Sequence, residues 1–109
     1  MNVFLHHIYE YQKGLRKLVL YTGCSTDRTA IIARLEKHKI DYIITQVSGK
    51  KINVFFGSQE CIAVLQNFRT LELDKISDSE DFILGVMLGY DVSLQCRRYV
   101  KRLELIKAG

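Results

Sequence analysis

The chain contains no proline and no tryptophan, and only three of its 109 residues are cysteine. With no proline and no run of small polar residues, nothing in the composition marks a linker, so we expect a single domain over residues 1–109. The three cysteines are odd in number and far apart, which excludes a disulfide framework and a zinc knuckle. We expect Cys24, Cys61 and Cys96 to be buried reduced thiols.

Long apolar runs are also missing. No uninterrupted apolar stretch approaches the roughly 20 residues of a membrane helix, and the first residues lack the basic and apolar regions of a signal peptide. Apolar residues make up 48% of the chain and charged residues 26%, which is ordinary for a folded protein and excludes a disordered one. We therefore expect a soluble, cytoplasmic protein with no membrane partner.

Two runs rich in β-branched and aromatic residues predict a β-hairpin in the middle of the chain, joined by a polar connection that contains Gly49. Helical patterns flank the hairpin, and a further strand precedes the first helix. The expected elements are a strand at residues 15–22, a helix at 26–38, strands at 42–47 and 52–56, and a helix at 58–68. From residue 18 onward this is a β-α-β-β-α unit.

Residues 2–11 have a β-favouring composition and no helix start signal, so we expect a fourth strand there, paired back on residues 15–22. A short helix over residues 8–17 is the alternative. The predicted fold is thus α+β, with a four-stranded antiparallel sheet, a ferredoxin-like core and helices on one face. Residues 1–68 hold the sheet and its two helices.

The remaining residues, 77–107, are expected to form a helical pair. Ser77 and Glu80 have the spacing of a capping box, which predicts the start of a strongly apolar and largely buried helix. Gly85 and Gly89 lie on one face of that helix, which favours close packing over a subunit contact. Asp91 can cap the last helix.

Charge is unevenly distributed along the chain, whose net charge is +4. Residues 91–109 carry five basic and two acidic side chains, whereas residues 72–81 carry five acids and one lysine. A charge run of this size is usually a solvated helix face. Its functional interpretation is a docking surface for an acidic partner, formed by the basic residues Arg97, Arg98, Lys101 and Arg102.

No catalytic signature is present, so our first hypothesis is a non-enzymatic protein that needs no cofactor. Adjacent histidines on a strand point to opposite faces, so His6 and His7 are not expected to share a metal ion. The alternative hypothesis is a small-molecule-binding or catalytic cleft made by the N-terminal segment, with binding residues His6, His7, Tyr9, Glu10 and Arg16. Nucleic-acid binding is not expected, because strand 51–56 lacks the glycine and aromatic spacing of RNA-binding modules.

Several strings resemble a family of small uncharacterised bacterial proteins, a domain of unknown function. The strings are residues 6–16, 52–57, 80–85 and 88–91, followed by Gln95-Cys96 and Arg98-Tyr99. The resemblance carries a loose association with genes beside flavodoxin, which implies a flavodoxin-linked accessory role. Flavodoxins are typically acidic, and a basic helix would complement them. We therefore expect an accessory or binding protein that docks an acidic redox partner such as flavodoxin, and we expect a homo-oligomer because an open sheet leaves edges to cover.

Overall fold

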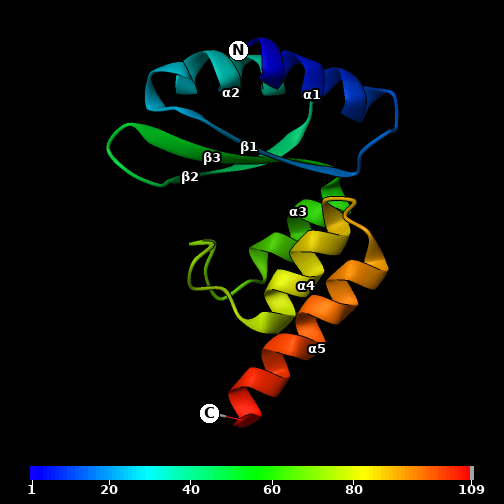
Figure 1. Ribbon diagram of the computed structural model, residues 1–109. Coiled ribbons are helices and arrows are strands. Elements are labelled where there is room, and N and C mark those ends of the chain that lie inside the picture. The colour runs from blue at the N-terminus through cyan, green and yellow to red at the C-terminus, as the bar shows by residue number, and fades with distance from the viewer. Residues whose placement is uncertain (109) are drawn as a thin grey trace.

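A three-stranded antiparallel sheet separates two layers of helices in the computed structural model, which describes the backbone of residues 1–108 and the side chains of residues 1–106 (Figure 1). The strands, in the spatial order β1-β3-β2, are β1 (Leu18–Cys24), β2 (Asp41–Gln46) and β3 (Lys51–Gly57). The helices are α1 (Asn2–Gln12), α2 (Arg28–Lys37), α3 (Gln59–Gln66), α4 (Asp78–Met87) and α5 (Val92–Ala108), with a 3₁₀ turn, η1 (Ser25–Asp27), before α2.

The central strand, β3, is buried on both of its faces. Ile52, Val54 and Phe56 pack with α1 and α2 on one side, and each is fully buried. Phe55, also fully buried, packs on the other side with residues of α3 and α4, among them Leu65. A strand that is apolar at consecutive positions is expected where helices cover both faces of a sheet.

The prediction of a four-stranded sheet is wrong, because residues 2–12 form the helix α1. Their buried side chains, Phe4 and Ile8, are four residues apart, and Tyr11 packs against the same core three residues further on. This is the spacing of a helical stripe. The alternative of a helix over residues 8–17 is also wrong in its bounds.

Gly14 ends α1 and is the sequence signal that the strand interpretation missed. Its φ of 77° is left-handed, the amide of Gly14 donates to Tyr11 O at 3.0 Å, and that of Leu15 donates to Glu10 O at 3.0 Å. These two bonds form a Schellman motif, which ends helices and which glycine favours.

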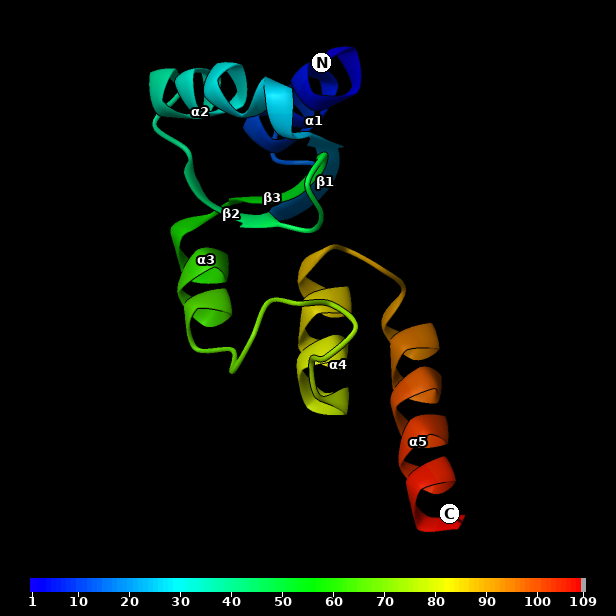
Figure 2. The ribbon, with the colours of Figure 1, turned by 90° about the vertical axis from the view of Figure 1, so that its left-hand side faces the viewer.

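The ferredoxin-like arrangement with helices on one face is wrong as well. Figure 2 shows α1 and α2 on one side of the sheet and α3, α4 and α5 on the other. The helix after β3 turns to the opposite face from α2, so Phe55 has a core of its own. The hairpin and the helices on either side of it lie where the sequence predicts them.

The capping box at the start of α4 is confirmed. Ser77 Oγ accepts a hydrogen bond from the Glu80 amide at 3.1 Å, and Glu80 Oε1 accepts one from the Ser77 amide at 2.8 Å. Glu80 Oε2 also accepts from the amide of Arg69 at 2.8 Å, so one carboxylate fixes both α4 and the preceding loop. These backbone donors lower the pKa of the Glu80 carboxyl.

Close packing at Gly85 is also confirmed. A Cβ at that position would lie 2.7 Å from Cδ of Gln95, so the glycine leaves room for this side chain of α5. For Gly89 the packing prediction is wrong, because it lies just beyond the end of α4 with a φ of 87° and a Cβ there would meet nothing within 4 Å. Within the described residues, no helix combines the length and apolar character needed to span a membrane.

We predict that Gly57→Ala destabilises the fold by about 2–4 kcal/mol. Gly57 has a φ of 155°, and an added Cβ would overlap the carbonyl oxygen of Lys17 and lie 2.9 Å from Cα of Leu18. Equilibrium urea denaturation measures the loss. The control is Gly49→Ala, where a Cβ meets nothing within 4 Å; equal losses for the two variants would contradict the prediction.

We further predict that Glu80→Gln destabilises the protein at neutral pH and that this loss of stability shrinks as the pH falls toward 3. Because the folded state lowers the pKa of Glu80, its stabilising effect is present above the unfolded pKa, near 4.3, and is lost as the pH falls through the folded value. Urea denaturation of both proteins across this pH range checks the sign. A difference in stability that does not shrink toward low pH would refute it.

Candidate functional site

Two of the four basic residues predicted for docking are bound within the chain. Arg98 Nε lies 2.9 Å from Asp81 Oδ2, and Arg102 Nε lies 2.7 Å from Asp78 Oδ1. Arg102 Nη1 is also 3.2 Å from Asp81 Oδ2. The carboxylate of Asp81 raises the pKa of Arg98. The acidic stretch found in the sequence therefore neutralises part of the basic helix, and these pairs hold α5 against α4.

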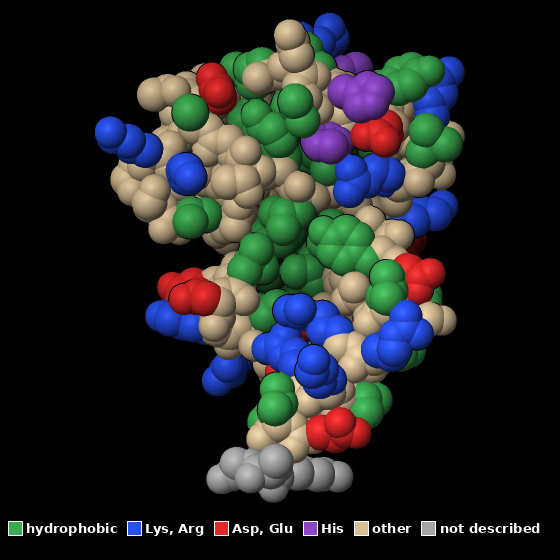
Figure 3. Space-filling model, viewed as in Figure 1, with side chains coloured by type: hydrophobic (Ala, Val, Ile, Leu, Met, Phe, Trp, Pro, Cys, Tyr) green, Lys and Arg blue, Asp and Glu red, His purple; other side chains and the backbone are tan. Residues whose placement is uncertain are grey.

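The other two, Arg97 and Lys101, are exposed and make no ion pair with any side chain of residues 1–106. They lie one turn apart on α5, between Leu94 and Leu105, which are 55% and 63% exposed. We call Arg97 and Lys101, together with Leu94 and Leu105 on either side of them, the basic stripe. Their spacing of three or four residues puts all four side chains on one helix face. Figure 3 shows lysine and arginine side chains gathered over α5.

Beside the basic stripe, α4 and α5 form an apolar groove of about 380 Å³. Phe82 and Tyr99 pack together in it with ring centroids 5.5 Å apart. Ile83 and Val100 are 37% and 51% exposed. The groove is lined by Ser79, Phe82, Ile83, Cys96, Tyr99 and Val100.

The prediction that α4 is largely buried is wrong. Leu84, Gly85 and Leu88 are buried, but Ile83 and Val86 on the outer side are 37% and 38% exposed. No basic or catalytic motif marks the groove. The signal that could have revealed it is that residues 82–88, after the acidic first turn of α4, are apolar on all sides although the helix has only one face against the sheet.

The second predicted site, on the N-terminal segment, is brought together by α1. Glu10 Oε1 lies 3.1 Å from His7 Nδ1, 3.9 Å from His6 Nε2 and 4.0 Å from Arg16 Nη1. We call His7, Glu10 and Arg16 the α1 cluster. As a strand the segment would hold His6 and Glu10 roughly 13 Å apart. Tyr9 stacks on His6 and is 53% exposed.

A single proton decides which bond His7 makes in the α1 cluster. Its Nδ1 lies 3.1 Å from the carboxylate of Glu10 and 3.3 Å from Nη1 of Arg16. If Nδ1 carries a hydrogen it can donate to Glu10, whereas without one it can accept from Arg16. The side chains of the cluster are about three-quarters buried. Figure 3 shows histidine side chains beside acidic and basic ones in the upper half of the molecule.

Metal binding finds no support among the described side chains, since no three His, Cys, Asp or Glu residues gather closely enough to hold an ion. The expectation of buried thiols is wrong for Cys24 and Cys96, which are exposed, and all three cysteines are free.

One nearly buried polar residue was not selected from the sequence. Asn53 of β3 is 7% exposed, and its Oδ1 accepts a hydrogen bond from Thr22 Oγ1 at 2.6 Å. No motif marks it, because its burial depends on strand pairing.

The chain matches a known family of proteins over most of its length. A family model described as a protein of unknown function (DUF2023) matches residues 2–102, from α1 into α5. No curated protein matches the chain. The resemblance found in the sequence to a domain of unknown function is thus confirmed.

Proposed function

We propose that this chain, which belongs to the family described as protein of unknown function (DUF2023), is a cytoplasmic, non-enzymatic accessory protein that docks an acidic partner protein on α4 and α5. The matched region includes the apolar groove and the two basic residues of the basic stripe, Arg97 and Lys101. The proposal therefore concerns a surface that lies inside the family's domain.

The observation that carries the proposal is the exposed apolar surface of the α4–α5 pair. A helix segment that is apolar all round, as residues 82–88 are, is normally buried, yet Ile83 and Val86 of α4 and Val100 of α5 are more than one-third exposed. Contiguous exposed apolar side chains rimmed by charged residues are typical of a protein-binding surface. A groove of about 380 Å³ can receive one or two side chains of a partner.

Charge selects the kind of partner. The exposed residues Arg97 and Lys101 directly follow the groove residues Cys96 and Val100 along α5, and the chain as a whole carries a net charge of +4. Rim charges contribute mainly to the association rate and to the choice of partner, while the apolar centre contributes most of the binding energy. An acidic surface with a protruding apolar side chain fits both features, and the resemblance stated above makes a flavodoxin the first partner to test.

We predict that a flavodoxin binds the protein with a micromolar Kd at low salt, and that Arg97→Glu with Lys101→Glu weakens binding by about tenfold or more. Calorimetry at low and moderate salt measures both values. The salt dependence should shrink in the double variant, because fewer ion pairs remain to be screened. Val100→Ser should weaken binding equally at both salt concentrations.

The matched control is Arg34→Glu with Lys37→Glu on α2, in the opposite helix layer. It changes the net charge by the same amount and should keep more than half of the affinity. Equal losses in the two double variants would show a general charge effect and overturn the docking site. Absence of flavodoxin binding at every salt concentration would reject this partner.

Self-association stays a separate prediction. In the sheet order β1-β3-β2, both β1 and β2 are edge strands, and an uncovered edge can pair with another chain. The molar mass from light scattering, measured on the protein alone, tests it before any partner is added.

The alternative function, a small-molecule-binding or catalytic cleft at His6, His7, Tyr9, Glu10 and Arg16, is supported by the short distances in the α1 cluster. It predicts that small carboxylic acids or phosphates cause saturable NMR shifts of the His7 ring, and that Arg16→Gln removes them. Shifts that rise linearly with the added compound would show that there is no specific site. The cluster would then be only a structural contact between α1 and Arg16.

A further inference from the structure

The face of the sheet that meets α3 and α4 is divided into an apolar half and a polar half. In the apolar half, Leu20, Phe55 and Ile43 are in register across the strands and pack into the core below the sheet. Two residues further along, Thr22 and Thr45 both pair with Asn53. Since side chains alternate along a strand, this polar row shares the same face.

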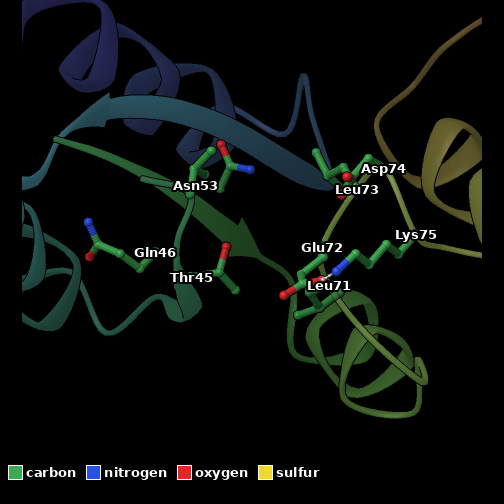
Figure 4. Close-up of a pocket in the computed structure, with 9 residues that line it drawn as sticks. Thr45, Gln46, Asn53, Leu71, Glu72, Leu73, Asp74 and Lys75 are labelled. Atoms are coloured by element: carbon green, nitrogen blue, oxygen red, sulfur yellow. Dashed lines mark ion pairs between the residues drawn. The ribbon is translucent and has the colours of Figure 1, made fainter. Parts of the chain in front are cut away.

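Beneath the polar half lies an open cavity of about 720 Å³. Figure 4 shows strand side chains along one side and the loop after α3 along the other. This volume is within the usual range of small-molecule sites. The cavity is lined by Thr45, Gln46, Val47 and Asn53 from the hairpin and by Leu71, Glu72, Leu73, Asp74 and Lys75 from the loop.

Asn53 supplies hydrogen-bond donors to this cavity. Its Oδ1 is occupied by the hydroxyl of Thr22, which turns Nδ2 the other way. Nδ2 donates to no group of the described residues, and no fully enclosed side-chain polar atom among them lacks a partner, so Nδ2 opens onto the cavity. Because Asn53 as a whole is only 7% exposed, Nδ2 is a donor largely shielded from bulk solvent, and a ligand acceptor in the cavity can bind it. Thr45 can donate its hydroxyl hydrogen beside it.

The loop side of the cavity carries the opposite chemistry. Glu72 is paired with Lys75 at 2.9 Å, but Asp74 makes no ion pair with any described side chain. Leu71, Leu73 and Val47 supply apolar surface around these groups. The site thus offers neutral donors on the sheet side, a carboxylate on the loop side and an aliphatic wall.

We infer that this cavity binds a small zwitterion with an aliphatic side chain, of which a free aliphatic amino acid is the simplest. Its carboxylate accepts from Asn53 Nδ2 and Thr45 Oγ1, its ammonium group pairs with Asp74, and its side chain packs on Leu71 and Leu73. A phosphate is a poorer fit, because the lining carboxylates would repel a dianion. This inference does not depend on the docking function.

L-Leucine is the probe, and N-acetyl-L-leucine and L-leucinamide are its matched analogues, since each lacks one of the two charges. We expect L-leucine to cause saturable shifts of the Asn53 side-chain amide and of the backbone amides of residues 71–75 in ¹H–¹⁵N NMR spectra. Each analogue should bind at least about tenfold more weakly, because one charged anchor is lost.

Two variants locate the anchors. Asn53→Asp keeps the acceptor for Thr22 but places a negative charge against the ligand carboxylate. Asp74→Asn removes the negative charge that pairs with the ammonium group. Each variant should weaken the binding of L-leucine by about tenfold. Glu60→Gln, an exposed acid in the first turn of α3, is the charge-matched control and should bind normally. Asp74 is exposed, so its variant remains informative if Asn53→Asp fails to fold.

The inference is overturned if L-leucine causes no saturable shifts up to about 50 mM, or if both analogues bind as well as L-leucine. It is also overturned if Asp74→Asn binds like Glu60→Gln. Shifts confined to α4 and α5 would place any binding in the apolar groove instead.

Discussion

Burial of β3 on both faces is the constraint on which the rest of the structure depends. Its side chains point alternately into two cores, with Val54 and Phe56 in one and Phe55 in the other. Each core needs its own helices, because a sheet of three strands cannot cover itself. The pair α1 and α2 serves the first core, and α3 with α4 serves the second. The helix α5 has no place on the sheet and packs on α4.

The local features of the fold follow from the sequence. The hairpin, the helices beside it and the capping box at Ser77 each rest on neighbours within a few residues. Residues 2–12 were misassigned because Phe4, Tyr9 and Tyr11 are residue types that favour strands, and propensity is only a weak prior. The helical spacing of Phe4 and Ile8 and the glycine at position 14 were better signals, since they report packing and helix termination.

The candidate sites depend on tertiary contacts that composition does not contain. The number of basic residues in α5 can be read from the sequence. Whether a basic side chain is free to bind a partner depends on which side chains lie against it in the fold. Asp78 and Asp81 lie against Arg98 and Arg102 only because α4 and α5 are antiparallel and close at Gly85. Likewise, the side chain of Asn53 meets those of Thr22 and Thr45 only in the observed register.

The two surfaces proposed for binding share the helix α4. The helices α3 and α4 cover the half of the lower sheet face that contains Phe55 and leave the half that contains Asn53 open. The loop that closes the open half is tied to α4, since Glu80 accepts from the Arg69 amide at 2.8 Å and Arg69 Nη2 donates to Lys75 O at 3.1 Å. The cavity wall and the docking face are therefore attached to the same helix. Different side chains form the two proposed sites, and α4 with the loop bound to it is the part of the structure that they share.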